Sequence, residues 1–326
     1  MDRHCRRSFL HACCVGAAAL ARHRPARAEA DLPSSLRILV GFAPGGPQDI
    51  VARTLAPGLA ARLERPCIVE NRAGASGNLA AEAVARAAPD GGTLLLCGPV
   101  NAINAAMFPA LRFDFAKDVA PVAGIARVPL VLLVRPSVPA DSVERLIEHA
   151  RAKAGAMTIA SAGNGTPQHV TGVLFQQRTG IRFAHVAYRG SAPALADLAA
   201  GHVETMFDAL PSALPFIRAG RVRALAVTTS ARASALPEVP CVSDTVAGFE
   251  SSSWYGLGVP SATPAGTIRA LHRAVTDAIA DPAIVGRLGT SGASPMPASV
   301  QEFERFVAAE TIKWRDVVAH AGIRPE

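Results

Sequence analysis

Residues 36–63 read L-R-I-L-V-G-F-A-P-G-G-P-Q-D-I-V-A-R-T-L-A-P-G-L-A-A-R-L. The first five residues form a short, mostly apolar run of the kind found in buried strands. Residues 41–47 then hold three glycines and two prolines, a composition typical of a tight turn. Beyond the turn, apolar residues recur at roughly helical spacing from Ile50 to Leu63. The stretch therefore predicts a strand, a glycine-rich turn and a helix, with a kink or break at Pro57 because proline disrupts a helix interior.

This order of elements aims the free N–H groups of a helix N-terminus at one place, which favours an anion there. The turn holds no lysine, so it is not a P-loop, and we interpret it as half of a binding cleft. The pattern recurs along the chain. Further strands are expected at 67–71, 93–97, 157–160, 203–208 and 222–228, and turns rich in glycine or polar residues at 72–78, 98–101, 161–169 and 186–191. Successive units of this kind predict parallel sheets whose turns face a ligand.

The domain organisation follows from length and from two predicted crossings. At 326 residues the chain exceeds a typical single domain, so we expect two lobes. We place the crossing into the second lobe at the apolar strand 130–134 and the return at 254–259. The C-terminal part is predicted to be helical and to pack on the first lobe. The first lobe is then discontinuous, with residues 29–128 and 250–326, and the second comprises 129–249.

Residues 1–28 have the features of a twin-arginine export signal. Arg6 and Arg7 precede an apolar run that ends at Leu20, and residues 26–28 (A-R-A) form a cleavage site. We therefore expect cleavage after Ala28 and a periplasmic protein. The alternative, a lipoprotein box at 10–13, would leave almost no apolar core before its cysteine. No later segment reaches the length of a transmembrane helix.

Removing the leader changes what charge and cysteine content indicate. The net charge of +7 falls to +2, because six arginines and one aspartate lie in residues 1–28. The chain is then not basic enough to indicate a nucleic-acid partner. Three cysteines remain, Cys67, Cys97 and Cys241, an odd number at unrelated spacings. They indicate neither a disulfide framework nor a metal site, and small buried side chains are the simplest interpretation.

Candidate ligand contacts lie in the turns and at the C-terminal ends of the predicted strands. They are Phe42, Gly45, Gly46, Gln48, Asn101, Ser161, Asn164, Gly165, Thr166, His169, Tyr188, Ser191 and Asp208. Structural alternatives stay open for several of them. The glycines could serve only the turns, residues 161–166 could cap a helix, and His169 could bond within its own lobe. Asp208 could accept a hydrogen bond from the ligand or orient a loop.

Six segments in this order resemble one known family. They are V-G-F-A-P-G-G-P-Q-D-I-V-A-R (40–53), V-E-N-R-A-G-A-S-G-N (69–78), A-P-D-G-G-T-L-L-L (88–96), I-A-S-A-G-N-G-T-P-Q-H (159–169), H-V-A-Y-R-G-S-A-P-A-L-A-D-L (185–198) and M-F-D-A-L-P-S-A-L-P (206–215). The chain resembles the solute-binding receptors of tripartite tricarboxylate transporters, the Bug proteins. The resemblance covers nearly all of the chain beyond the leader.

The resemblance implies an α/β, two-lobed periplasmic binding protein of the type II-like, Venus-flytrap kind, each lobe a mostly parallel sheet flanked by helices. Such a receptor closes on a small carboxylate and delivers it to membrane permease subunits, without a cofactor or metal and as a monomer. In the family the carboxylate is held largely by backbone amides and waters from loops like 42–48 and 161–166. The family usually has a small residue and then Thr or Ser where this chain has Pro47-Gln48.

Two other functions remain possible from the sequence. One is an exported hydrolase that uses Ser161, His169 and Asp208 as nucleophile, base and orienting group. The chain lacks the G-x-S-x-G elbow of many such enzymes, so we expect a protein that is not an enzyme. The other is a receptor that reports its ligand to a sensor kinase, which would use the same closed form.

Overall fold

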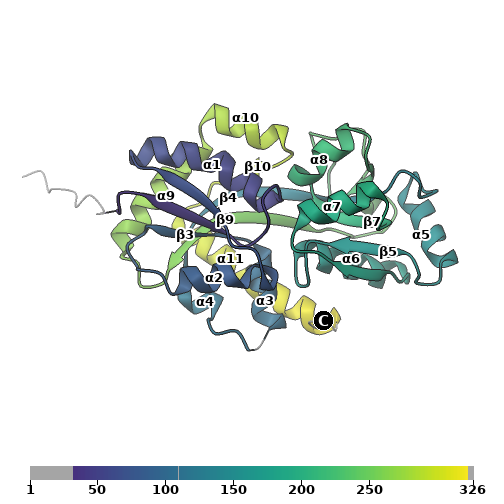
Figure 1. The fold of residues 1–326 in the computed structure, drawn as a ribbon, viewed down its shortest axis with the longest axis horizontal. Coiled ribbons are helices and arrows are strands. Elements are labelled where there is room, and N and C mark those ends of the chain that lie inside the picture. Colours follow the sequence, from purple (N-terminus) through teal and green to yellow (C-terminus); the bar gives the residue numbers. More distant parts are fainter. Residues whose placement is uncertain (1–31, 109, 322–326) are drawn as a thin grey trace, which may run out of the picture.

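The computed structural model describes residues 32–108 and 110–321, which form two α/β lobes side by side (Figure 1). The predicted export signal lies outside the described residues. The first lobe begins with β1 (Leu36–Val40), α1 (Pro47–Leu63), β2 (Cys67–Asn71), the short helix η1 (Ala75–Gly77), α2 (Asn78–Ala85), β3 (Thr93–Cys97), α3 (Pro99–Met107) and α4 (Phe115–Asp118). A 16-residue strand, β4 (Val119–Val134), then leads into the second lobe.

The second lobe contains α5 (Val143–Ala152), β5 (Thr158–Ser161), α6 (Pro167–Thr179), β6 (Ala184–Ala187), α7 (Ser191–Ala200), β7 (Thr205–Ala209), α8 (Leu210–Arg218), β8 (Arg223–Val227) and the short helix η2 (Val242–Asp244). The chain returns through β9 (Ser252–Pro260) and ends with α9 (Ala265–Ile279), α10 (Pro282–Thr290), β10 (Ser294–Pro295) and α11 (Val300–Ala321).

One sheet runs through both lobes in the order β2-β1-β3-β9-β4-β7-β5-β6, with β8 and β10 also paired to β4. The first part of β4, residues 119–129, pairs with β9, and residues 130–134 pair with β7 and β8. The outer strands of each lobe are parallel, as expected, but β4 and β9 run antiparallel to their neighbours. The two-lobed α/β class is confirmed, and the prediction of mostly parallel sheets needs this correction for the central strands.

Helix α1 continues through Pro57, so the break considered there is absent. Pro57 is exposed, and the next residue, Gly58, faces α10. A methyl group added at Gly58 would lie 2.4 Å from Cδ1 of Ile284, so the glycine allows the two helices to approach closely. This packing offsets a proline cost that is about 3 kcal/mol in an isolated helix interior.

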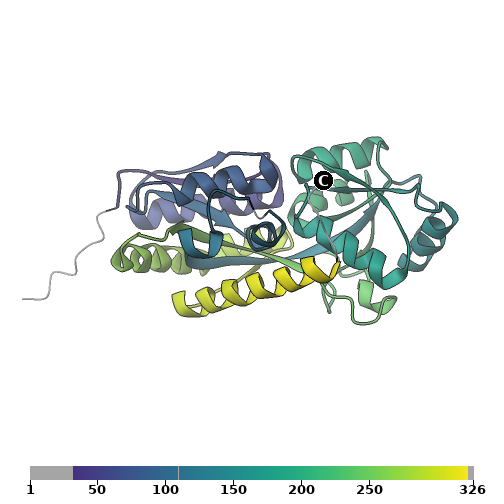
Figure 2. The same ribbon diagram turned by 90° about the horizontal axis from the view of Figure 1, so that it is seen from below.

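Helix α11 lies along the first lobe and reaches the second (Figure 2). Near β9, Trp254 packs edge-on against Phe303 and Phe306 of this helix. At its far end, Trp314 and Val318 belong to a small apolar cluster with α3 and with Val170 of α6. The C-terminal helix therefore contacts both lobes. Cys67, Cys97 and Cys241 are free; Cys97 and Cys241 are buried, and Cys67 is partly exposed.

Candidate functional site

A small cavity lies where four helices begin. Its lining residues are Phe42, Pro47, Gln48, Pro99, Val100, Thr166, Pro167, Gln168, Ser191 and Tyr255. Helices α1, α3 and α6 each start with a proline at this cavity, and α7 starts with Ser191. The enclosed space is about 20 Å³, little more than one water needs.

The electrostatics of this cavity favour an anion. Its lining side chains carry no formal charge, while each helix N-terminus contributes a partial positive charge. Proline at the first helical position lacks an N–H, so the following residues supply the donors. The backbone N–H groups of Gln48 and Gln168, which follow Pro47 and Pro167, have no acceptor among the described residues. They are free to donate to a ligand.

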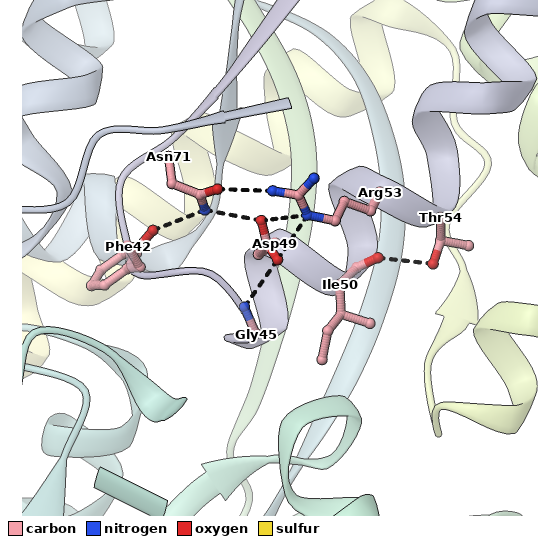
Figure 3. Close-up of polar contacts among 7 residues, drawn as sticks. All are labelled: Phe42, Gly45, Asp49, Ile50, Arg53, Thr54 and Asn71. Atoms are coloured by element: carbon pink, nitrogen blue, oxygen red, sulfur yellow. Dashed lines mark hydrogen bonds and ion pairs between the residues drawn. The ribbon is translucent and has the colours of Figure 1, made fainter. Parts of the chain in front are cut away.

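The first cleft loop, residues 41–49, is held by a buried carboxylate (Figure 3). Asp49 accepts hydrogen bonds from Gly45 N (2.9 Å), Asn71 Nδ2 (2.9 Å) and Arg53 Nε (2.9 Å). Asn71 also donates to the carbonyl of Phe42 and accepts from Arg53. Burial raises the pKa of Asp49, but the hydrogen bonds from Arg53, Gly45 and Asn71 outweigh it, so the pKa is lowered. The Gly45 amide is therefore engaged by Asp49 and turned away from a ligand.

The second cleft loop, residues 161–169, is held by uncharged groups. Thr166 caps α6: its Oγ1 accepts from His169 N (3.4 Å) and donates to the carbonyl of Gly163 (2.7 Å). The Gly165 N–H donates to Nδ1 of His169 (3.2 Å). Ser161 Oγ accepts from Gly163 N and lies 2.7 Å from Nε2 of His185. The loop is thus fixed by two imidazoles and two hydroxyls.

Asp208 lies behind the cavity wall and is fully buried. Its Oδ1 accepts from Ser191 Oγ (2.6 Å) and Gln168 Nε2 (3.2 Å), and its Oδ2 accepts from Ser212 Oγ (2.5 Å). Burial raises the pKa of Asp208 against these hydrogen bonds. Ser191 and Gln168 both line the cavity, so Asp208 orients two cavity side chains without lining the cavity itself.

The lobes come together where a loop glycine of each lobe lies against a helix of the other, α3 for Gly165 and α7 for Gly45. Methyl groups added at Gly165 and Gly45 would lie 2.6 Å from Oδ1 of Asn104 and 3.6 Å from Cβ of Ala192, respectively. Gly165 also has a φ of +72°, which favours glycine. The missing side chains let each loop approach a helix of the opposite lobe, so the two lobes are in contact in the described conformation.

The thirteen candidates fall into distinct places. Phe42, Gln48, Thr166 and Ser191 line the cavity, with Gly45, Gly46 and Gly165 in the surrounding loops. Ser161 and His169 line a second cavity of about 200 Å³ between α6 and the β5–β6 edge.

Asn101, Tyr188 and Asp208 bond within their own lobes. Asn101 Oδ1 accepts from Gly98 N (3.0 Å) at the start of α3, and Tyr188 donates to Asp197 (2.7 Å). Oδ1 of Asn164 is buried without a partner. Ligand contact by any of the thirteen stays a prediction.

Sequence reasoning missed several lining residues, chiefly Gln168 and Tyr255. A signal for Gln168 was available, because P-G-G-P-Q-D (44–49) and N-G-T-P-Q-H (164–169) both place Pro-Gln at a helix start. The hydrolase alternative gains no support from the geometry. Ser161, His169 and Asp208 bond to three different groups of partners, and no hydrogen bond joins any two of them within residues 32–321 as described.

Two further classes of feature are absent from the part of the chain that the structure describes. It contains no cluster of three or more His, Cys, Asp or Glu side chains suited to a metal ion. It also contains no helix with the length and apolar character needed to cross a membrane.

Comparison with known proteins agrees with this geometry. The family described as "Tripartite tricarboxylate transporter family receptor" matches residues 51–323. Protein BugT of Bordetella pertussis is 34% identical over 292 residues, covering 89% of this chain and 90% of BugT.

Two solved structures from Rhodopseudomonas palustris are also similar. Rpa4515, solved with adipate, is 36% identical with a TM-score of 0.87, covering 90% of this chain and 98% of that one. MatC, solved with bound malate, is 32% identical with a TM-score of 0.82, covering 87% and 98%. The converging helix N-termini and the match along most of the sequence lead to one conclusion: the chain belongs to the receptor family of the tripartite tricarboxylate transporters, which includes the Bug proteins.

Proposed function

We propose that this protein is a periplasmic receptor that captures a small organic carboxylate between its lobes and delivers it to the membrane permease of a tripartite transporter. It performs no chemistry on the ligand. The observation that carries the proposal is the convergence of four helix N-termini, from α1, α3, α6 and α7, on one uncharged cavity. The adipate and malate bound in two similar proteins support a carboxylate as the ligand class.

The magnitudes are consistent with binding without an arginine clamp. A helix N-terminus stabilises a negative charge by about 0.3–1 kcal/mol when exposed and by up to about 2 kcal/mol when partly buried. Four of them, with the free N–H groups of Gln48 and Gln168, supply much of the roughly 8 kcal/mol that micromolar affinity requires. Closure of the lobes excludes water and strengthens each of these interactions.

The same proposal includes the two lobes and the export signal. The lobes are residues 29–128 with 250–326, and 129–249, and the boundary falls within β4, where its pairing changes from β9 to β7 and β8. The leader is cleaved after Ala28. Mass spectrometry of the protein recovered from a periplasmic fraction checks this, and an intact N-terminus or a lipidated Cys13 would contradict it.

Gln48 offers the sharpest test of the anion site. Its side chain is only 5% exposed, lines the cavity and makes no hydrogen bond to any described residue. Gln48→Glu would place a negative charge in the cavity, and we expect the affinity for a bound carboxylate to fall by at least about tenfold. An acidic residue in the first turn of α1 is favourable, so the melting temperature of the ligand-free protein should not fall.

The experiment is calorimetric titration with a panel of mono-, di- and tricarboxylates that includes adipate and malate. Gln301→Glu, at an exposed position of α11, makes the same charge change far from the cleft and is the matched control. Binding that is equally strong in the wild type and the Gln48→Glu variant would refute the site. A panel with no binder at all would refute the receptor function.

A further inference from the structure

His169 connects a titratable side chain to the second cleft loop. The imidazole Nδ1 accepts the backbone N–H of Gly165 at 3.2 Å, so this nitrogen must carry a lone pair. The neutral ring therefore holds its proton on Nε2. Gly165 is also the residue at which a methyl group would meet Asn104 of the other lobe, at 2.6 Å. The bond from His169 thus fixes a backbone position on which closure depends.

Protonation would reverse the direction of this bond. An imidazolium has N–H groups at both nitrogens, so Nδ1 can no longer accept from Gly165. The Gly165 N–H and the Nδ1–H would then point at each other. The ring must rotate or the loop must move, and either change releases the backbone of residues 163–165 from its present conformation.

His185 stacks on His169, and this makes it costly to protonate both imidazole rings. The His169 and His185 rings stack with centroids 4.3 Å apart and an angle of 17° between their planes. Nε2 of His185 lies 2.7 Å from Ser161 Oγ, which in turn accepts from Gly163 N at 3.2 Å. Both imidazoles therefore support the same loop, one at Gly165 and one through Ser161. Two imidazolium rings at this distance would repel each other.

Among the described residues that line the cavity beside His169, none is acidic. The carboxylate of Asp208, on the neighbouring strand β7, is engaged by Ser191, Ser212 and Gln168. Residues of β5, α6 and β6 line the 200 Å³ cavity beside it, and their titratable side chains are His169 and His185 alone. Burial and the neighbouring His185 are the causes that lower the pKa of His169 to about 4. No acidic or basic side chain of the described parts of α3 or α11 contributes to this shift.

We propose that His169 is a positioning residue for the second cleft loop and is held neutral when the receptor is closed. Acidification then releases the ligand by protonating the His169 imidazole. This inference rests on the proposed function and adds regulation of ligand binding by pH. His169 then acts through Gly165 and not by contact with the ligand. A receptor outside the cytoplasm experiences the acidity of its surroundings, so the device would make capture depend on external pH.

The decisive variant is His169→Asn. The side-chain oxygen of asparagine can occupy the place of Nδ1 and accept the Gly165 N–H, but it does not titrate. Calorimetric titration with malate, or with adipate if malate does not bind, is run at several values between about pH 7.5 and 4.5 for the wild type and the variant. The ligand is protonated to the same extent in both titrations. The ratio of the two affinities therefore reports only the effect of protonating His169.

We expect the wild-type affinity to fall roughly tenfold more than that of His169→Asn over this range, because a group with a lowered pKa resists protonation only in the conformation that lowers it. His202→Asn, at an exposed histidine of the same lobe, should follow the wild type. Parallel affinity curves for wild type and His169→Asn would overturn the proposal.

A second measurement needs no ligand. NMR of the ligand-free wild type follows the His169 ring nitrogens and the Gly165 amide through the same titration. The proposal requires both to change with one common midpoint. A Gly165 amide that does not respond while His169 titrates would refute the link to the loop. If no carboxylate binds but Gly165 and His169 titrate together, the proposed function has failed and the link between proton and loop has survived.

Discussion

The first cleft loop (41–49) and the second (161–169) face each other across the cavity, and each ends with Pro-Gln at the start of a helix. Their supports differ. The first is held by the Asp49 carboxylate with Arg53 and Asn71, a network of charge-assisted hydrogen bonds. The second is held by the neutral groups of Thr166 and His169. The backbone of the first loop is therefore held by a fixed charge, and that of the second loop by an imidazole ring that can be protonated.

This difference suggests a division of labour between the lobes. A carboxylate with a lowered pKa stays ionised across the physiological range, so the first loop keeps its shape. A histidine changes charge near neutral pH unless its environment prevents it. The first loop is therefore suited to be a constant half of the site and the second to be the variable half. The three predictions that follow test this contrast, in order of decreasing effect.

The largest effect is expected from Gly165→Ala in the second loop. The added methyl group would lie 2.6 Å from Oδ1 of Asn104 and 2.9 Å from Sδ of Met107, and the residue has a positive φ. Closure should be obstructed, and we expect calorimetry to show a loss of about 100-fold in affinity, equivalent to about 2.7 kcal/mol.

Gly180→Ala is the matched control for this variant. Gly180 has nearly the same φ, +70°, and no atom lies within 4 Å of the added methyl group. Its alanine variant should lose about 1 kcal/mol of stability from backbone strain and keep the wild-type affinity. Equal affinities for the two alanine variants would mean that the close approach of the second cleft loop to α3 is not needed for binding.

A smaller effect, on stability, is expected from Asp49→Asn in the first loop. The substitution keeps the size of the side chain but removes the charge that accepts from Arg53, Asn71 and Gly45. Arg53 is 51% exposed and can be solvated again, so we expect the free energy of unfolding to fall by about 2 kcal/mol. Chemical denaturation of the ligand-free protein measures this.

Asp316→Asn, in an exposed ion pair on α11, controls for loss of a surface charge and should change stability by less than about 0.5 kcal/mol. A decrease that is no larger for Asp49→Asn than for this control would show that the first loop does not depend on its carboxylate.

The cleft loops are also where sequence reasoning performed best, because glycine and proline have strong local effects on the backbone. The turns at 41–47 and 161–169 follow strands and open helices as expected. The length of β4 was not predicted beyond residues 130–134. Pro121, Gly124 and Pro129 argue against a strand, yet β4 pairs with β9 along this length. Two irregularities in register lie next to Pro121 and Gly124, and Pro129 stands at the end of the pairing.

The site was harder to predict than the fold. Local pattern identified the loops, but which side chains meet at a cavity depends on how distant helices are oriented. Tyr255 and Gln168 were missed for this reason, and Asn101, which caps its own helix, was included. Hydrogen bonds between residues far apart in the sequence, such as that from Asn71 to Asp49, leave no local pattern that distinguishes a support from a ligand contact.

The smallest expected effect is a difference between the two loops in the pH at which each ceases to stabilise the fold. The pKa of His169 is lowered from 6.5 to about 4, so below about pH 6.5 the unfolded state binds more protons than the folded state. Its contribution to stability is therefore fully present above pH 6.5 and is lost as the pH falls toward 4. The pKa of Asp49 is lowered from 3.8, so its contribution is lost only at still lower pH.

Denaturation of the wild type should accordingly show stability falling by about 1 kcal/mol between about pH 7 and pH 5.5, where the first loop is unaffected. His169→Asn should flatten this part of the profile, and Asp49→Asn should leave its slope unchanged while lowering the whole curve. If the slope above pH 5.5 disappeared in Asp49→Asn and persisted in His169→Asn, the roles of the two loops would be reversed. A profile equally flat in all three proteins would mean that the His169 ring is solvated well enough to be protonated without cost to the fold.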